Sequence, residues 1–260
     1  MTTLDLSPTT SAEVPVRTEP LNRRLRVLFN GRFIADTTAA IYVFEQGHLP
    51  VYYLPKADVD ASVLRQTATT SHCPRKGDAV YWSVEVDGKV AEDAVWAYPD
   101  PLSQVGELAG YVAFYWNKMD GWYEEDEEVF VHPRDPYHRV DVLSSSRHVE
   151  VSVNGVVVAD TRRPHLLFET GLPVRYYIPK VDVRLEHLRP SGTRTSCPYK
   201  GTASYYDVAA DGAVNTDIVW YYPAPLPEIP KIENLLCFYN EKVDITVDGV
   251  LQDRPQTHWS

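Results

Sequence analysis

The 260-residue sequence predicts a mainly β protein made of two tandem, small antiparallel domains with little helix. Three observations predict this class. The second half of the chain repeats the first, β-rich stretches meet at Asn-Gly and Asp-Gly pairs, and helical patterns are few while 20 prolines punctuate the chain. Asn-Gly between β-branched residues is a strong signal for a hairpin, and short strands between turn signals are typical of all-β domains.

The internal repeat predicts the domain organisation. Asn30-Gly31 recurs as Asn154-Gly155, and the other recurring phrases lie at the same offset of 124 residues. They include Tyr52-Tyr53 with Tyr176-Tyr177, Cys73-Pro74 with Cys197-Pro198, Lys76-Gly77 with Lys200-Gly201, and Trp96 with Trp220. Two copies of about 100 to 120 residues have the usual size of single domains.

The domain boundaries follow from the composition around the copies. Residues 1–22 are rich in Thr, Ser and Pro, and we expect them to form a disordered tail. The first domain then covers residues 23–143 and the second 144–260, joined at the Ser-rich segment 143–147. The acidic run 120–128 is interpreted as a solvated strand or loop, since no spaced ligand pattern for a cation accompanies it.

The elements follow the same pattern in both copies. In the first domain, residues 27–35 and the pair Asp87-Gly88 predict two hairpins. In the second domain, residues 149–159 and the pair Asp211-Gly212 repeat them, and residues 245–251 predict one more. Helix patterns are limited to two short stretches and one ambiguous segment, at 59–66, 183–189 and 107–114.

The charge and composition argue against several classes of protein. The net charge of −11 argues against a nucleic-acid binder, because such proteins neutralise phosphates with Lys and Arg. No apolar run approaches the roughly 18 residues of a membrane span, and the N-terminus has no signal-peptide core. Three cysteines are too few for a disulfide scaffold. We therefore expect a cytoplasmic protein without membrane or nucleic-acid partners.

Cys73 and Cys197 are the first candidates for catalysis, since each begins a Cys-Pro-x-Lys-Gly phrase. The lysine three residues later, Lys76 or Lys200, would favour the thiolate and make it a nucleophile. The alternative is structural, because cysteine is among the most buried residue types and often serves as a small core residue. The residues alone leave both interpretations open.

Two carboxylates and two further lysines are also candidates. Glu45 and Glu169 follow apolar residues, where a carboxylate with a raised pKa could act as a general base. Either carboxylate could instead form a structural ion pair with a lysine. Lys56 and Lys180 follow a Tyr-Tyr-x-Pro phrase. The interpretations for Lys56 are convergence with Lys76 on an anionic ligand, or a solvated strand end.

An aromatic set is the most suggestive feature for binding. Trp96 and Tyr98 share one strand face by the period of two, and Trp220 and Tyr222 repeat them. Aromatic walls with a few polar groups are typical of a small-molecule pocket, and the alternative is that they only build the core. The predicted ligand-binding residues are Tyr53, Lys56, Trp82, Trp96 and Tyr98 in the first copy and Arg162, Tyr177, Lys180, Trp220 and Tyr222 in the second.

The recurring phrases together resemble a known bacterial family. The second copy contains FETGLPVRYYIPKVDV, CPYKGTASYYDV and VWYYPAPL, and the first contains FEQGHLPVYYLPKADV, CPRKGDAVYWSV and VWAYPDPL. These phrases are similar to the family catalogued as domain of unknown function 427 (DUF427), over nearly all of residues 25–245. The family resembles the β-tent group, which implies two roughly orthogonal antiparallel sheets enclosing a pocket in each copy.

The resemblance also carries a nucleotidyltransferase-like label, which the motifs do not support. The chain has neither a Gly-Ser with a D-x-D carboxylate pair nor a glycine-rich phosphate loop. Many β-tent relatives hold zinc with paired Cys-x-x-Cys ligands, and this chain has no such pair. We therefore expect neither a nucleotide cofactor nor a metal.

Three function classes follow from these residues. We favour a cofactor-independent enzyme on a small metabolite, in which Cys73 or Cys197 is the nucleophile. The lysine of the same phrase would activate the thiol, and the Glu45 or Glu169 carboxylate would move protons. The alternatives are a non-catalytic module with a ligand in an aromatic cage, and an assembly protein whose tyrosine-rich faces form a homodimer.

Overall fold

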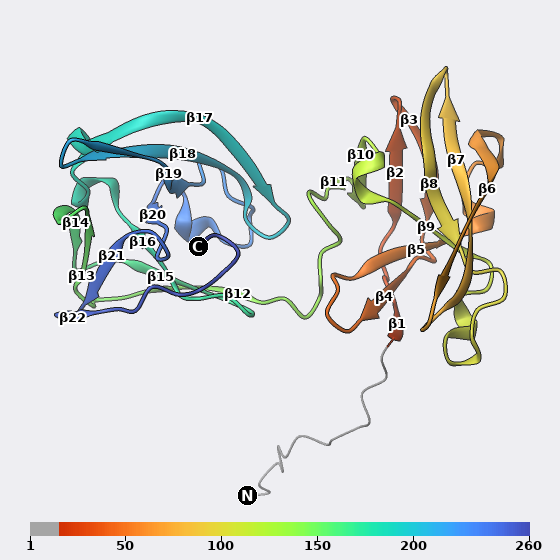
Figure 1. Cartoon of the computed structure of the whole chain (residues 1–260), viewed down its shortest axis with the longest axis horizontal. Coiled ribbons are helices and arrows are strands. Elements are labelled where there is room, and N and C mark those ends of the chain that lie inside the picture. The colour runs from red at the N-terminus through yellow and green to blue at the C-terminus, as the bar shows by residue number, and fades with distance from the viewer. Residues whose placement is uncertain (1–15) are drawn as a thin grey trace, which may run out of the picture. The chain divides into compact units, whose positions relative to one another are not determined.

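The structure, a computed structural model of the chain, describes residues 16–260. Residues 1–15, most of the predicted N-terminal tail, lie outside the described part. The chain divides into two compact units between Asp135 and Pro136, each with its own sheets and core. Strands make up most of the regular structure, and the helices in the described part are short 3-10 turns (Figure 1).

The first domain contains two antiparallel sheets. The larger has seven strands in the order β1-β4-β5-β9-β8-β7-β6, and the smaller has four in the order β11-β10-β2-β3. The larger sheet consists of β1 (Val16–Pro20), β4 (Ile41–Glu45), β5 (Val51–Pro55), β6 (Leu64–Cys73), β7 (Gly77–Val86), β8 (Lys89–Ala97) and β9 (Tyr111–Phe114). The smaller sheet consists of β2 (Leu25–Phe29), β3 (Arg32–Thr37), β10 (Gly121–Glu124) and β11 (Glu127–Glu128).

The second domain repeats this arrangement. Its seven-stranded sheet has the order β12-β15-β16-β20-β19-β18-β17, and its four-stranded sheet the order β14-β13-β21-β22. The larger sheet consists of β12 (Val140–Ser144), β15 (His165–Glu169), β16 (Arg175–Ile178), β17 (Leu188–Cys197), β18 (Gly201–Ala210), β19 (Ala213–Tyr221) and β20 (Leu236–Phe238). The smaller sheet consists of β13 (Val149–Val153), β14 (Val156–Thr161), β21 (Asp244–Val247) and β22 (Val250–Leu251).

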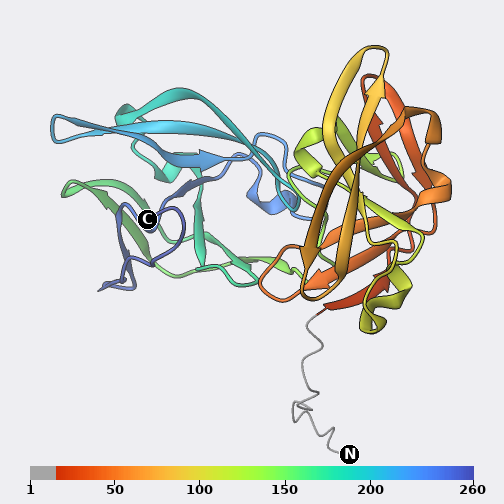
Figure 2. The same cartoon turned by 45° about the vertical axis from the view of Figure 1, so that its right-hand side comes forward.

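The shared topology confirms the predicted class, mainly β with two tandem antiparallel units. Each strand of the second domain takes the place of one in the first, with β12 in the place of β1 and β13 in the place of β2. Within the second domain, β17, β18 and β19 lie on one side, and the smaller sheet lies on the other (Figures 1 and 2).

The predicted hairpins are confirmed, and their turns have the expected backbone. Asn30 and Gly31 link β2 to β3 with φ of 48° and 75°. A turn with positive φ at both central residues matches the twist of the flanking strands, and Asn, Asp and Gly tolerate it best. Paired positive φ values recur at Asp87-Gly88, Asn154-Gly155, Asp211-Gly212 and Asp248-Gly249.

Three segments differ from the sequence prediction. Val16–Pro20, in the predicted tail, is strand β1, because it pairs with β4 and buries Val16. Val140–Ser144, at the predicted boundary, is strand β12, because it pairs with β15 of the second domain. The predicted helix at 59–66 is a single 3-10 turn, Ala61–Val63, that leads into β6. The edge strands β1 and β12 each have five residues, too few for an alternating hydrophobic pattern to be recognised in the polar sequence around them.

The larger sheet is covered on both faces, and the two faces carry different clusters. In the first domain, one face packs against the smaller sheet and forms the main core, which includes Val27 and Trp82. The opposite face carries Tyr53 and Tyr98 and packs with the 3-10 segment Ser103–Leu108. The second domain has the same two clusters. The space between the sheets is therefore filled by side chains, and the candidate site lies on the opposite face.

Residues of the acidic run 120–128 take part in the packing and ion pairs of the first domain, although the sequence predicts a solvated segment. Glu124 is buried, where it accepts hydrogen bonds from Arg23 and Tyr52. Asp120 accepts a hydrogen bond from Lys89 at 2.5 Å. Within residues 16–260, no cluster of three or more His, Cys, Asp or Glu side chains is arranged to hold a metal ion. No helix of this part of the chain has the length and apolar character to cross a membrane.

Candidate functional site

The Cys-Pro-x-Lys-Gly phrase forms the tight turn between β6 and β7. The Lys76 amide donates to the Cys73 carbonyl at 3.2 Å, so Pro74 takes the second position of a β-turn, where its fixed φ is favourable. Gly77 follows with φ of +105°, and a Cβ there would lie 3.3 Å from the carbonyl oxygen of Asp100. The turn therefore requires glycine, because the loop after β8 passes close to it.

The second domain builds the same turn. The Lys200 amide donates to the Cys197 carbonyl at 3.4 Å. Gly201 has φ of +94°, and its Cβ position would lie 3.3 Å from the carbonyl oxygen of Ala224. Turn geometry thus accounts for the proline and the glycine of the recurring phrase.

The lysine of the turn is buried and bound to the predicted carboxylate. Lys76 donates a hydrogen bond from Nζ to Glu45, and Arg75 Nη1 lies 3.2 Å from Glu45 Oε1. Burial raises the pKa of Glu45, but the hydrogen bond and charge of Lys76, with His48 and Arg75, outweigh it and leave the pKa below its ordinary value. Glu45 thus forms an ion pair with a lysine, as the second of its two interpretations from the sequence expects. Its carboxylate is a weaker base than that of a free glutamate.

Glu169 is paired in the same way in the second domain. Lys200 Nζ lies 2.5 Å from each carboxylate oxygen, and His138 Nε2 lies 2.9 Å from Oε1. Burial raises the pKa of Glu169, but Lys200 and then His138 outweigh it and leave the pKa below its ordinary value. Neither carboxylate has the raised pKa that would suit a general base.

An aromatic cavity lies on the outer face of the larger sheet in the first domain. Its volume is about 230 Å³. Its wall combines the Lys76–Glu45 pair, smaller side chains such as Val51, and five aromatic rings: Tyr53, Tyr81, Trp96, Tyr98 and Tyr115. Burial raises the pKa values of Tyr53 and Tyr98, so their hydroxyls are neutral near pH 7.

The ring wall has the same geometry in both domains. Trp96 Nε1 donates to the Tyr53 hydroxyl at 3.1 Å, and the ring centres of Trp96 and Tyr115 lie 4.6 Å apart. The second domain repeats these contacts, at 3.1 Å and 4.5 Å, through Trp220, Tyr177 and Tyr239. The predicted residues Tyr98 and Tyr222 are buried in the same clusters as these rings.

The cysteines lie outside the cavity wall. Cys73 is half-buried beside this cluster and is not among the residues that line the cavity. Lys76, expected to activate the thiol, directs its amine to Glu45. Cys197 is half-buried in the equivalent turn. Cys237 is fully buried, and this burial raises the pKa of its thiol to about 12.

Four of the predicted ligand-binding residues lie away from the ring wall. Trp82 belongs to the core between the sheets, because its neighbour on the strand faces the cavity. Lys56 Nζ lies 4.1 Å from the ring centre of Trp82, so it does not join the lysine of the turn. Lys180 Nζ lies 4.6 Å from the ring centre of Tyr221, and Arg162 is exposed on the loop after β14.

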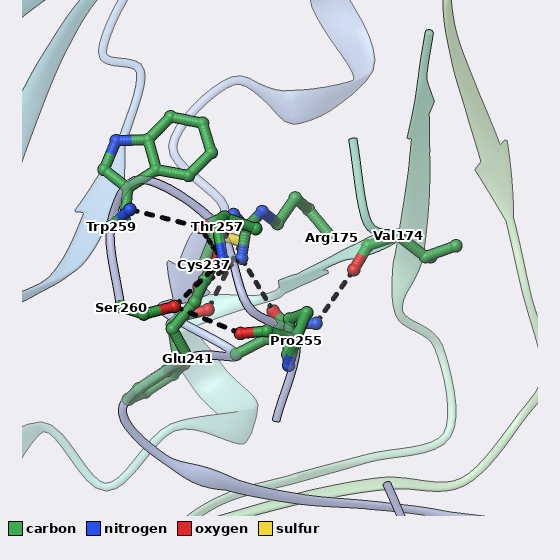
Figure 3. Close-up of polar contacts among 10 residues, drawn as sticks. Val174, Arg175, Cys237, Glu241, Pro255, Thr257, Trp259 and Ser260 are labelled. Carbon is green, nitrogen blue, oxygen red and sulfur yellow. Dashed lines mark hydrogen bonds and ion pairs between the residues drawn. The ribbon is translucent and has the colours of Figure 1, made fainter. Parts of the chain in front are cut away.

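In the second domain, an arginine occupies the space above the tryptophan. Arg175 takes the position that Val51 has in the first domain, and its guanidinium carbon lies 5.5 Å from the ring centre of Trp220. Its terminal nitrogens bind Glu241 at 2.8 and 2.7 Å, and both side chains are almost fully buried (Figure 3). Burial raises the pKa of Glu241, but hydrogen bonds from Arg175 and Thr257 outweigh it and bring the pKa to about 2.

The C-terminal segment closes this site. The Thr257 hydroxyl donates to Glu241 at 2.7 Å, and the ring centre of Trp259 lies 5.2 Å from the guanidinium carbon of Arg175 (Figure 3). Trp259 also lies 6.4 Å from the ring of Tyr239. The guanidinium therefore contacts two indole rings with a carboxylate beside it, which is the chemistry of a cation-binding cage.

The equivalent segment of the first domain takes another path. The Arg134 amide donates to the Tyr52 hydroxyl at 3.3 Å, and the Tyr42 hydroxyl donates to the Arg134 carbonyl at 2.9 Å. Both tyrosines belong to the core between the sheets, so this segment covers the edge of that core and does not line the cavity. Accordingly, Tyr115 is 39% exposed whereas its equivalent Tyr239 is half-buried, and Trp96 is half-buried whereas its equivalent Trp220 is only 8% exposed.

Sequence reasoning missed the residues that distinguish the two domains. These residues are Arg175, Glu241 and Trp259. The repeat was interpreted through its matching positions, whereas these three are mismatches between the copies. The available signal was an arginine inside the apolar phrase VRYYI, because a buried charge needs a partner.

Comparison with known proteins agrees with this two-domain description. A family model described as domain of unknown function (DUF427) matches residues 17–125 and again residues 141–249. The two matches cover most of the chain, and the protein therefore belongs to this family, with two tandem copies of its domain. A search of curated proteins finds no significant match.

Proposed function

We propose that this protein binds a small molecule in the aromatic cavity of the first domain. The observation that supports this function is the difference between two equivalent sites. The second domain fills its site with Arg175 and Trp259, whereas the first domain has Val51 at the equivalent strand position and a cavity of about 230 Å³. Aromatic walls with a few polar groups are the usual composition of a ligand site.

The proposal favours binding without a covalent step at the cysteine. A thiol mechanism needs Lys76 beside Cys73 and a basic Glu45. The lysine and the carboxylate are bound to each other, and the pKa of the carboxyl is lowered. The turn and the ion pair occur in both domains, including the second, whose site is filled by Arg175 and Trp259, which supports a structural role for them.

The test uses fluorine NMR of the full chain labelled with 5-fluorotryptophan. The chain has six tryptophans, and the resonances of Trp96 and Trp220 are assigned with the variants Trp96→Phe and Trp220→Phe. The labelled protein is titrated with a fragment library containing neutral, anionic, cationic and zwitterionic members. We expect a subset of fragments to shift the Trp96 resonance in a saturable way and to leave Trp220 unchanged.

Trp220 is the matched control, because it makes the same hydrogen bond and ring contact as Trp96. The proposal fails if no fragment moves the Trp96 resonance. It fails equally if the same fragments move both resonances in parallel, because the second site would then be as accessible as the first. A fragment affinity by calorimetry that is weakened in Trp96→Phe and retained in Trp220→Phe would locate the site in the first domain.

A further inference from the structure

The second domain shows which chemical group the ring wall accepts. The guanidinium of Arg175 lies 5.5 Å from Trp220 and 5.2 Å from Trp259, and Glu241 supplies its negative partner. A cation over an aromatic face is attracted by the ring quadrupole, most strongly over tryptophan. The position above this tryptophan is therefore a cation position built into the fold.

The first domain has the same aromatic rings at this position but has no arginine–glutamate pair there. Trp96 and Tyr115 retain the ring arrangement, at 4.6 Å and 44° against 4.5 Å and 51° in the second domain. Val51 replaces the arginine and Asn117 replaces its glutamate. Val51 lines the cavity together with both rings. Lys118 Nζ lies 4.9 Å from the ring centre of Tyr115, but Lys242 lies 5.1 Å from Tyr239 in the same way, so this lysine is common to both domains. Over Trp96 itself the first domain has no counterpart of the Arg175–Glu241 pair, and a cationic group of a ligand fits there.

Basic side chains outnumber the carboxylate at the Lys76–Glu45 pair of the cavity wall, where His48 also lines the cavity. Glu45 is the carboxylate there, and it is shared between Lys76 and Arg75. In the second domain Tyr199 replaces the arginine, and Glu169 is bound by Lys200 and by the His138 ring. Lys76 is buried, and the Arg75 side chain is 37% exposed. An anionic group of a ligand would be attracted to Lys76, because Arg75, which lies outside the cavity lining, also neutralises Glu45.

We infer that the ligand of the first domain is a small zwitterion. Its guanidinium or quaternary ammonium group lies over Trp96, in the place that the Arg175 guanidinium has over Trp220, and its acid group lies at Lys76, whose partner Glu45 is shared with Arg75. A ω-guanidino acid or a betaine has this chemistry. The inference rests on the proposed function and adds the class of ligand to it.

Three probes that differ by one charged group test the inference. The zwitterion is 4-guanidinobutanoate, propylguanidine lacks the acid, and butanoate lacks the cation. Each is titrated into the full chain by calorimetry and by the Trp96 fluorine resonance. We expect the zwitterion to bind at least about tenfold more tightly than either truncated probe. If butanoate or propylguanidine binds as tightly as the zwitterion, the inference is wrong, while the proposed function stands on any fragment that binds at Trp96.

Two exchanges of residues between the domains sharpen this test. Val51→Arg with Asn117→Glu installs the ion pair of the second domain, and we expect it to abolish binding of 4-guanidinobutanoate. The reverse exchange, Arg175→Val with Glu241→Asn, is the matched control and should leave binding to the first domain unchanged. Unchanged affinity in the first double variant would overturn the cation position.

Arg75→Tyr tests the acid end separately, at a partly exposed position of a turn where the second domain has tyrosine. We expect this variant to lower the affinity for 4-guanidinobutanoate to that of propylguanidine, with no change for propylguanidine itself. An equal loss for both probes, or no loss for either, would contradict the placement of the acid group. This variant keeps the inference testable if the double variant does not fold.

Discussion

The two domains present the same ring wall to different surroundings. In the first domain, Trp96 and Tyr115 face a cavity of about 230 Å³. In the second, the equivalent rings face Arg175 and Trp259 of the chain itself. The comparison teaches that Arg175 on β16, its partner Glu241 after β20 and the C-terminal Trp259 fill a site without altering the sheet that builds it.

The shared residues and the differing residues therefore have different roles. The Lys–Glu pair and the glycine turn occur in both domains, and both are explained by burial and close backbone approach. Val51, which lines the cavity, takes the place of Arg175, and Asn117 takes the place of its partner Glu241. The shared residues stabilise the sheet and the turn, and the differing residues determine what lies against the aromatic rings.

The largest expected effect comes from breaking the ion pair that fills the second site. Glu241→Ala leaves the Arg175 guanidinium buried without its carboxylate, which ordinarily costs about 3–5 kcal/mol. We expect the free energy of unfolding of the second domain to fall by about this amount while the first domain is unaffected. Hydrogen exchange in increasing urea, followed by mass spectrometry of peptides from each domain, measures both values.

The double variant Arg175→Val with Glu241→Asn is the control for this prediction. It carries the residues that the first domain uses at these positions. Because no charge is then left unpaired, it should recover most of the lost stability. A loss in Glu241→Ala of less than about 1 kcal/mol would show that the pair is not the desolvated contact described here.

The next largest effect concerns the third cysteine, which has no counterpart in the first domain. Burial raises the pKa of Cys237 to about 12, from an ordinary value of 9.0. This lowers its thiolate fraction near neutral pH by about a thousandfold, so Cys237 should be alkylated by iodoacetamide about that much more slowly than an ordinary thiol. Peptide mass spectrometry of the folded chain gives the rates of all three cysteines.

The same experiment tests the thiol hypothesis from the sequence. If Cys73 or Cys197 reacts faster than an ordinary thiol, the hypothesis of a cysteine nucleophile gains support, and the experiment identifies the domain that carries it. If both react more slowly, the cysteines are structural parts of their turns. Equal rates at Cys237 and Cys73 would contradict the difference in burial between them.

A smaller effect is expected from acid. Glu241 has a folded pKa of about 2 against an ordinary value of 4.5, so the unfolded state binds its proton first as the pH falls. The stabilisation is complete above pH 4.5 and is lost between pH 4.5 and about 2, with a total of about 3 kcal/mol. The pKa values of Glu45 in the first domain and of Glu169 in the second are both lowered, so these two carboxylates contribute to acid sensitivity in both domains. The additional loss from Glu241 should appear only in the second domain.

Glu241→Gln provides the reference for the acid prediction. Its second domain should be less stable than the unmodified one at pH 7, and the difference between them should shrink as the pH approaches 2. Urea unfolding at a series of pH values measures that difference. A constant difference between pH 7 and pH 2 would mean that Glu241 does not titrate as described.

The fold was largely accessible from the sequence, because its signals are local. Asn30-Gly31 and its equivalents predict hairpins through the backbone of a two-residue turn, and the repeat transfers each prediction to the other domain. Strand β1 was missed, because its pairing with β4 is a long-range contact that leaves little pattern in five residues. Such edge strands are defined by the neighbour they pair with rather than by their own composition.

The site was only partly accessible for a related reason. The period of two correctly places Trp96 and Tyr98 on one face, and the same rule sends Trp82 to the opposite face from Tyr81. Lysine three residues after Cys73 suggests an activated thiol in an extended chain. In a turn that closes a hairpin, that lysine is the last residue of the turn, immediately before β7, and its amine reaches Glu45 instead.

The smallest expected effect separates the C-terminal segment from the ion pair beneath it. Trp259→Ala removes an aromatic contact with Arg175 and another with Tyr239, from a side chain that is only half-buried. We expect the second domain to lose about 1–2 kcal/mol, less than in Glu241→Ala, because the guanidinium keeps its carboxylate. Gln256→Ala, at an exposed position of the same segment, is the control and should change stability by less than about 0.5 kcal/mol. If Trp259→Ala behaves like this control, the segment only rests on a site that Arg175 already fills, and the arginine alone accounts for the difference between the two domains.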